Sequence, residues 1–366
     1  MLVFFTIIGI LHSIIFTIFY FRWRAIPKTE VSKSSGSNEV SVIIPVRNEV
    51  GVIENLLESL SFQKTSQITY EVILIDDHSE DGLYETLAPL QNKFSYPLRI
   101  FKLPEDKVGK KSAVTLGVER ARYDMILCTD ADCLPKSSWI STMVACFTQR
   151  QNKMISGPVI MNATNFIGKI QQLEFAGLIG FGAISLHGDH PGMCNGANMA
   201  FSKKAFFEVK GYKGNEHIAS GDDEFLLQKI AGKYPDRVEF VKNPDAIITT
   251  PAKESFFALI QQRLRWAGKW RFHKSIFIKS SAILSFLDFL LGVLMLLAAI
   301  KYPVLWFSLI FRFAGEWIYL NAVSRFLRIR SSHFYLLILS IIYPFFVVIL
   351  GIASIFGKYS WKGRQY

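Results

Sequence analysis

The stretch VSVIIPVRNE, at 40–49, is an apolar run of strand length that ends in a polar cluster, and this pattern recurs further along the chain. The later apolar runs are EVILID at 71–76, LRIFKL at 98–103 and DMILCTD at 124–130. The segments between the runs have apolar residues at helical spacing, at 50–62, 83–94 and 112–121. This alternation of strands and helices predicts an α/β fold, a parallel sheet wrapped by helices.

Polar residues gather where these predicted strands end. PVRNE follows the first strand, DDHSED the second and DADC the fourth. Sheets of this kind bind ligands at the carboxyl ends of their strands. We therefore expect the functional site at that edge.

Asp130 and Asp132 straddle Ala131 just past the fourth predicted strand. Carboxylates two residues apart at a strand end can converge on one hard cation, and Mg²⁺ and Mn²⁺ prefer such oxygen ligands, often shared with substrate phosphates. The alternative is a turn with solvated carboxylates.

Asp76 and Asp77 end the second predicted strand. A carboxylate there can accept hydrogen bonds from a nucleobase or a ribose hydroxyl. Helix capping by Ser79 or Asp81 is the alternative, and both can hold. Gly109-Lys110-Lys111 precedes a predicted helix and offers a cation and helix-terminal amides to a phosphate or carboxylate. The GxxxxGK[ST] and GxGxxG spacings are absent, which disfavours a P-loop or a dehydrogenase.

GDDEFL, at 221–226, places three acids at the start of an amphipathic run. A carboxylate held near apolar surface can act as a general base toward a hydroxyl. Acids at the positive end of a helix are the alternative. QQRLRWAGKWRFHK, at 261–274, is either a basic and aromatic membrane-interface belt or a set of groups for a diphosphate and a sugar or lipid.

Residues 1–21 carry no Asp, Glu, Lys or Arg. The segment is long enough to cross a membrane as a helix, and Arg22 and Arg24 after it predict a cytoplasmic continuation. Candidate spans also lie at 281–300, 303–323 and 333–356. One segment could instead be re-entrant or interfacial. Arg312 and Glu316 are four residues apart and are expected to pair inside a bundle.

The net charge of +11 is unevenly distributed. Residues 39–250 hold 22 Lys and Arg against 26 Asp and Glu, while residues 251–366 hold 15 against 3. Positive charge beside apolar segments is attracted to anionic headgroups, and a slightly acidic soluble region argues against nucleic-acid binding. The four cysteines show no metal-binding spacing and are expected to be reduced thiols.

In this order the motifs resemble those of the family 2 glycosyltransferases with a GT-A fold, over about Val40 to Trp270. The resemblance implies nucleotide-sugar binding and catalysis by a defined set of residues. The set comprises the PxxNE residues Pro45, Asn48 and Glu49, the nucleobase acids Asp76 and Asp77, the GK residues Gly109 and Lys110, the metal-binding Asp130 and Asp132, the base Asp223 and the QxxRW residues Gln262, Arg265 and Trp266. The family has Thr-Glu before the base where this chain has Gly221-Asp222, so Asp222 is the other candidate for the base.

The implied reaction is an inverting transfer from a nucleotide-diphosphate sugar, which is expected to be UDP-linked, with Mn²⁺ or Mg²⁺ held on the diphosphate. Arg265 is expected to contact the diphosphate and Trp266 to line the acceptor path. Because few membrane segments are expected, a lipid hydroxyl is the first acceptor considered, as in ceramide glucosyltransferase-like members. The alternative is a polysaccharide or oligosaccharide synthase. Outside this class stands a nucleotide-binding membrane transporter or scaffold without turnover.

The expected organisation has four parts, with the catalytic domain on the cytoplasmic side of a bacterial inner membrane. They are an anchor at 1–22, a linker at 23–39, a GT-A domain at 40–275 and a C-terminal membrane region at 276–366. Membrane lipids are expected partners.

Overall fold

The computed structural model describes residues 2–30, 38–65, 67–188, 191–216, 218, 220–269, 272, 275–330, 332–356, 360–361 and 364–365. Part of the expected linker, at 31–37, lies outside the described residues, as do Trp270 and positions 357–359 and 362–363 of the basic tail. Contacts divide the chain into two compact units, each of which is described by itself. We name residues 27–160 and 185–251 the sheet unit, and residues 1–26, 161–184 and 252–366 the helical unit. The domain limits expected from the sequence stay predictions.

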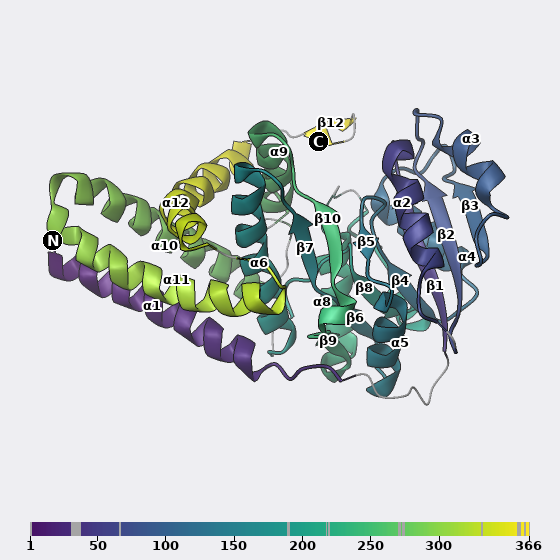
Figure 1. Cartoon of the computed structure of the whole chain (residues 1–366), viewed down its shortest axis with the longest axis horizontal. Helices are drawn as coiled ribbons and strands as arrows, with labels where there is room; N and C mark the ends of the chain where they lie inside the picture. Colours follow the sequence, from purple (N-terminus) through teal and green to yellow (C-terminus); the bar gives the residue numbers. More distant parts are fainter. Residues whose placement is uncertain are drawn as a thin grey trace. The chain divides into compact units, whose positions relative to one another are not determined.

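A seven-stranded sheet with the strand order β3-β2-β1-β4-β8-β6-β9 forms the core of the sheet unit (Figure 1). The strands are β1 (Glu39–Val46), β2 (Thr69–Asp76), β3 (Leu98–Lys102), β4 (Met125–Cys128), β6 (Met154–Ser156), β8 (Met199–Ser202) and β9 (Val238–Phe240). The first four strands in the chain run parallel, as expected. Val46 pairs with Asp76, so β1 and β2 end together and bring their polar loops side by side.

Further along the sheet, β8 runs in the opposite direction. β8 runs antiparallel to both β4 and β6, while β9 is parallel to β6. Met199 opens β8 and pairs with Cys128, the last residue of β4. The chain therefore enters β8 from the edge where β4 ends, which reverses its direction. A second sheet contains β5 (Leu134–Pro135), β10 (Ile248–Pro251) and β7 (Val159–Asn162) in that order.

Amphipathic helices complete the sheet unit. They are α2 (Val50–Ser61), α3 (Leu83–Leu87), α4 (Lys110–Arg120), α5 (Trp139–Gln149), α7 (Lys203–Glu208) and α8 (Asp222–Lys233). α2 buries Ile53, Leu56, Leu57 and Leu60, the spacing of one helical face. α3 is shorter than the helix expected at 83–94, because Pro89 in the following 3₁₀ turn has no amide hydrogen to continue it.

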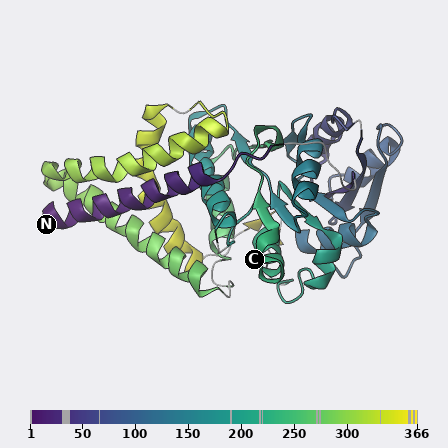
Figure 2. The same cartoon turned by 90° about the horizontal axis from the view of Figure 1, so that it is seen from below.

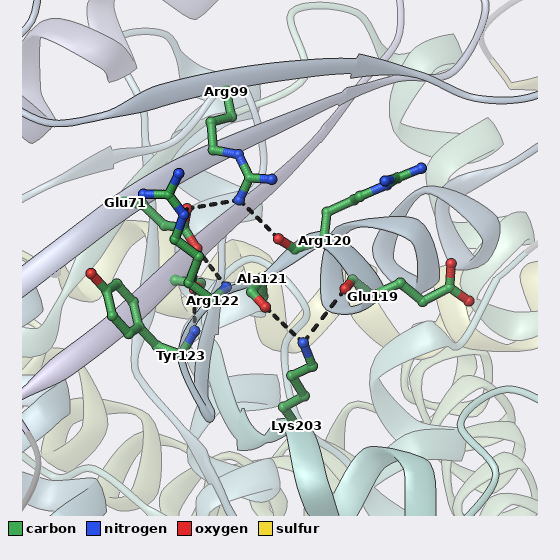
Figure 3. Close-up of polar contacts among 9 residues, drawn as sticks. Glu71, Arg99, Glu119, Arg120, Ala121, Arg122, Tyr123 and Lys203 are labelled. Atoms are coloured by element: carbon green, nitrogen blue, oxygen red, sulfur yellow. Dashed lines mark hydrogen bonds and ion pairs between the residues drawn. The ribbon is translucent and has the colours of Figure 1, made fainter.

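The C-terminal end of α4 is attached to the sheet by a cluster of polar contacts around buried Glu71 (Figure 3). Glu71 of β2 is almost fully buried and accepts a hydrogen bond of 3.0 Å from Arg99 of β3. Arg99 also donates to the carbonyl of Arg120, and the Lys203 ammonium donates to that of Ala121. Cations on these last carbonyls satisfy groups that the helix itself leaves unpaired. The position of α4, and thus of its first residue Lys110, is fixed from its far end.

Long helices make up most of the helical unit. They are α1 (Leu2–Ala25), α6 (Phe166–Leu186), α9 (Phe256–Ala267), α10 (Ile276–Lys301), α11 (Trp306–Phe326) and α12 (His333–Phe356). Within the described residues, three are long and apolar enough to cross a membrane, at Leu2–Ala25, Ile278–Lys301 and His333–Ile355. The expected fourth span forms as α11 but does not meet that composition. α1 and α11 run side by side in both views (Figures 1 and 2).

Four polar side chains join α1, α10 and α11 near the middle of these helices. His12 contacts Asp288 through Nδ1 at 2.7 Å and Glu316 through Nε2 at 2.8 Å. Arg312 donates to both oxygens of Asp288, at 3.1 and 3.2 Å. The expected pairing of Arg312 with Glu316 is therefore wrong, since each has a partner on another helix. We name these four residues the buried quartet.

Glycines allow α1 and α11 to approach at backbone distance on both sides of this quartet. A Cβ at Gly9 would lie 2.5 Å from the carbonyl oxygen of Ser308, and one at Gly315 would lie 2.5 Å from that of Ser13. Contacts this short exclude any side chain at either glycine. α1 is thus an integral part of the helical unit.

Replacing His12 by alanine should destabilise the helical unit by about 3–5 kcal/mol, because buried Glu316 and partly buried Asp288 lose their common partner. The measurement is the unfolding free energy of the detergent-solubilised chain. His333→Ala at the exposed start of α12 is the matched control and should change it by less than about 0.5 kcal/mol. Equal effects of the two substitutions would contradict the role of the quartet.

Candidate active site

The loops after β1 and β2 are bound to one another by Arg47, which sequence reasoning did not single out. Its buried guanidinium donates to the carbonyl oxygens of Asp77 and His78, at 2.7 and 2.6 Å, and pairs with Glu80 at 3.1 Å. In the sequence Arg47 is a single cation between an apolar strand and the Asn48-Glu49 pair. These bonds hold the two strand-end loops in one arrangement.

The PxxNE residues lie at this junction. Pro45 belongs to β1, and Glu49 immediately precedes α2. Asn48 adopts a left-handed φ of 53°, which asparagine tolerates better than most residues. Its side-chain oxygen accepts a hydrogen bond from the Glu80 backbone amide at 2.8 Å, and its backbone amide donates to the Ser79 hydroxyl at 2.9 Å. Asn48 thus shapes the loop. Its expected contact with a ligand stays a prediction.

Asp76 and Asp77 are both buried where β2 ends. Asp76 Oδ1 accepts from the Ser79 amide at 3.0 Å, and Asp77 Oδ2 accepts from the Gly109 amide at 3.0 Å. Helix capping is also present, but by Asp81, whose two oxygens accept from the first amides of α2 and α3. The Asp77 bond brings the second strand end to the first residues of α4.

Lys110 joins three motifs of the sequence. Its ammonium lies 2.7 Å from Asp130 Oδ1 and 3.3 Å from Asp222 Oδ2. Burial alone would lower the pKa of Lys110, but Asp130 and then Asp222 outweigh it and hold that pKa above its usual range. Burial would likewise raise the pKa of Asp222, and Lys110 outweighs it, leaving the pKa below 3.8. This carboxylate is therefore charged at neutral pH, and its pair with Lys110 is lost only as the pH falls through that lowered pKa.

Gly196 completes this centre. A Cβ there would lie 3.1 Å from Asp222 Oδ2 and 3.2 Å from Lys110 Nζ, so the backbone closely covers the ion pair. The Gly196 amide donates to Asp223 Oδ2 at 3.1 Å. Asp222 and Asp223 begin α8 after Gly221, whose left-handed φ of 79° favours glycine. The residues of the DxD, GK and acidic helix-start motifs therefore do meet.

The two candidates for the base differ in their surroundings. Asp222 is buried and paired with the Lys110 ammonium, whereas Asp223 is half-buried and its described bonds come from backbone amides. A carboxylate already paired with an ammonium is a poor proton acceptor. This difference favours Asp223 for the base, which stays a prediction.

Asp130 and Asp132 follow β4 in a tight turn closed by the Cys133 amide on the Asp130 carbonyl at 3.1 Å. Asp132 Oδ1 lies 3.5 Å from the Thr250 hydroxyl. Within the described part of the chain, no group of three or more His, Cys, Asp or Glu side chains is arranged to hold a metal. Mg²⁺-like sites commonly use only one or two carboxylates plus substrate phosphates. These hard oxygen donors, one of which already binds an ammonium, fit a cation shared with a diphosphate.

Gln262, Arg265 and Trp266 all lie on α9, in the helical unit. Their neighbour Arg263, which sequence reasoning missed, is buried and pairs with Glu174 of α6. Arg263 and Glu174 are 89 residues apart and belong to no sequence motif, so the sequence does not predict that they pair.

Two further residues near the centre are structural. Asn198 is fully buried, accepts a hydrogen bond from the Trp139 indole and donates to the carbonyls of Pro158 and Ala246. Lys111, beside Lys110, donates to the carbonyls of Asn215 and Ile218 at 2.7 Å each. It ties the start of α4 to the segment before α8.

Comparison with known families decides the class of protein. Residues 41–209 match the family described as Glycosyl transferase family 2. Over these residues the chain is similar to the family 2 glycosyltransferases. The matched residues include the PxxNE, acidic-pair, GK and DxD motifs, and the expected family and enzyme class are confirmed.

Curated relatives of this glycosyltransferase include poly-beta-1,6-N-acetyl-D-glucosamine synthases of Staphylococcus. Those of Staphylococcus aureus strain MSSA476 and of Staphylococcus epidermidis strain ATCC 35984 are each 25% identical to it over 281 residues. The matched region covers 73% of this chain and 64% of each relative. The chain thus spans less than two thirds of the length of these relatives.

A solved structure supports the fold. The mannosyltransferase of Pyrobaculum calidifontis, in complex with GDP-Man and Mn²⁺, superposes with a TM-score of 0.60 and 15% sequence identity. The superposition covers 97% of this chain and 97% of that one. The expected α/β GT-A fold class is confirmed.

The thiols of the sheet unit should react in a fixed order. Burial raises the pKa of Cys146 to about 12 and raises the pKa values of Cys128 and Cys133, whereas Cys194 is partly exposed. At about pH 8 we expect iodoacetamide to modify Cys194 first and the other three only after unfolding. Peptide mapping by mass spectrometry measures this, with the denatured chain as control. Equally fast modification of Cys146 in the native chain would be inconsistent with this packing.

Proposed function

We propose that this glycosyltransferase transfers a sugar from a nucleotide-diphosphate sugar to a hydroxyl of a glycan acceptor, as an oligosaccharide or polysaccharide synthase. The observation that carries the proposal is the meeting of four motifs at one edge of the sheet, through Lys110 with Asp130 and Asp222 and through Asp77 with Gly109. Such a centre has the acids and the cation that binding and breaking a sugar diphosphate require.

In this proposal each part of the donor has its own residues. Asp77, with Asp76 beside it, accepts hydrogen bonds from the nucleobase or ribose. Lys110 is close enough to Asp130 to serve the same anionic diphosphate once the donor is bound. Asp223 removes the proton from the acceptor hydroxyl as that oxygen attacks the anomeric carbon from the face opposite the leaving group. Gln262, Arg265 and Trp266 serve the diphosphate and the acceptor.

A divalent cation supplies charge stabilisation on the leaving diphosphate. Asp130 and Asp132 would hold it, and the mannosyltransferase with the same fold is described in complex with Mn²⁺. UDP stays the first expectation for the nucleotide of the donor.

For the acceptor, the comparisons favour a glycan, which was the alternative from the sequence, over a lipid hydroxyl, which was the first expectation. The relatives that match most of this chain are named as synthases of a polymer, poly-beta-1,6-N-acetyl-D-glucosamine. We therefore place a glycan acceptor ahead of a lipid hydroxyl. The three candidate membrane spans support a membrane-bound enzyme, and the basic Arg22 and Arg24 support a cytoplasmic sheet unit.

Asp223→Asn should bind the donor with unchanged affinity yet lose transfer by about 10²–10⁴-fold, because the amide cannot accept the proton. The measurements are donor binding with Mn²⁺ and the initial rate of sugar transfer.

Asp222→Asn is the matched control, since it removes a neighbouring acid with the same change of charge. It should weaken the Lys110 pair and lower thermal stability, while the loss of transfer stays smaller than in Asp223→Asn. Full turnover by Asp223→Asn would transfer the role of base to Asp222.

Membranes containing the chain should form a product that stays in the aqueous phase on organic extraction, when supplied with labelled UDP- and GDP-sugars and Mn²⁺. Label entering the organic phase would instead identify a lipid acceptor. Chelation of the cation should abolish either product. The Asp130→Asn variant, which removes one expected cation ligand, is the control for chemical hydrolysis of the donor.

A further inference from the structure

We infer that Arg263 and Glu174 are positioning residues for the QxxRW helix, and that α6 acts as the strut that holds this helix in place. Neither residue belongs to a motif of the resemblance, and Arg263 occupies a variable position within QxxRW. The inference rests on the proposed function, because it concerns how Gln262 and Trp266 serve that reaction.

The pair itself is buried and doubly bonded. The side chains of Arg263 and Glu174 are 4% and 7% exposed. Arg263 Nε donates to Glu174 Oε1 at 3.1 Å, and its Nη2 donates to the other carboxylate oxygen. Two parallel bonds fix the plane of the guanidinium as well as its position.

From this fixed position Arg263 holds two residues of the motif. Its Nη1 donates to Gln262 Oε1 at 2.6 Å, so the oxygen of that side-chain amide is engaged and its NH₂ group is the part that can donate to another partner. The guanidinium lies 4.2 Å from the centre of the Trp266 ring, and Phe175 flanks the same indole at 5.9 Å. A stacked guanidinium restricts the rotation of an indole.

Further contacts along α6 also hold this helix against its neighbours. Gln171 exchanges two hydrogen bonds with the backbone of Lys253, just before α9 begins, at 2.8 and 3.0 Å. Gln171 and Glu174 are three residues apart, and therefore lie on one face of α6. Further along α6, the Tyr319 hydroxyl of α11 donates to the Gly177 carbonyl at 2.8 Å. A Cβ at Gly180 would lie 2.5 Å from that hydroxyl, so the two helices are in close contact.

These contacts form one continuous chain from α11 through α6 to α9. Arg263 contributes no group to the reaction in this arrangement. It sets where the Gln262 amide and the Trp266 ring lie, and misplacement of such groups by about 1 Å can cost about 10²-fold in rate.

The first test is Arg263→Lys in the full chain. Lysine keeps the charge opposite Glu174 but loses the planar fork and the stacking. We expect kcat of transfer to fall by about 10²-fold, with the KM of the donor and the thermal midpoint unchanged. Wild-type kcat in this variant would overturn the inference.

The second test separates positioning from stability. Glu174→Gln should lose both stability and transfer, and Glu254→Gln, an exposed acid ahead of α9, is its matched control. The exchange Glu174→Arg with Arg263→Glu should restore the thermal midpoint toward the wild-type value while transfer stays low, because no guanidinium then lies beside Gln262. Recovery of transfer together with stability would show a merely structural pair and overturn the inference.

A third readout does not depend on activity. The tryptophan emission of Arg263→Lys should differ from wild type, and this difference should vanish when both are compared in a Trp266→Phe background. If wild type transferred no sugar from any donor but this emission difference held, the proposed function would fail while the contact stood. An unchanged emission would overturn the contact itself.

Discussion

The Lys110 ammonium is the interaction on which the arrangement of the site depends. Asp130 and Asp222 come from distant parts of the chain, and without a cation between them their carboxylates would repel one another in a poorly solvated place. The backbone at Gly196 lies close to the pair, so a side chain there would have to displace the Asp222 carboxylate or the Lys110 ammonium slightly. The contacts of Lys110 therefore order these side chains within the protein itself. In the proposed function Asp130 would hold the cation and Lys110 would bind the diphosphate.

Helix α4 carries this ammonium, and both of its ends are fixed by charge. At the C-terminal end, the Arg99 guanidinium and the Lys203 ammonium bind the last carbonyls, and buried Glu71 binds Arg99 in turn. At the N-terminal end, Lys111 holds the segment before α8, where Asp222 begins the helix. A helix held at both ends cannot slide along the sheet. The distance between the GK motif and the acidic start of α8 is thereby set by groups remote from the site.

Features that depend on one segment of the sequence were predicted correctly. Contacts between distant segments were not. The parallel strands and the acids at their ends follow from apolar runs of strand length, which is why the edge bearing Asp77 and Asp130 was found. The reversal of β8, the partner of Asp222 and the Arg263–Glu174 pair depend on which segments meet in space. Glu174 lies in an apolar helix, 89 positions before Arg263, and no local spacing reports that separation. The expected pairing of Arg312 with Glu316 was wrong for the same reason. A helical spacing of four residues permits that pair, but Arg312 binds Asp288 of α10 instead.

The same quartet explains why composition alone leaves α11 out of the candidate spans. Its charged residues Arg312 and Glu316 are buried against α10 and α1, while Phe307, Ile310 and Phe311 are exposed. Each ring nitrogen of His12 faces a carboxylate oxygen, so both contacts are hydrogen bonds when both ring nitrogens carry a proton. The imidazolium and the Arg312 guanidinium then balance the two carboxylates of the quartet. Because the charges near the middle of α11 are paired inside the bundle, this helix can lie beside α1 in a membrane.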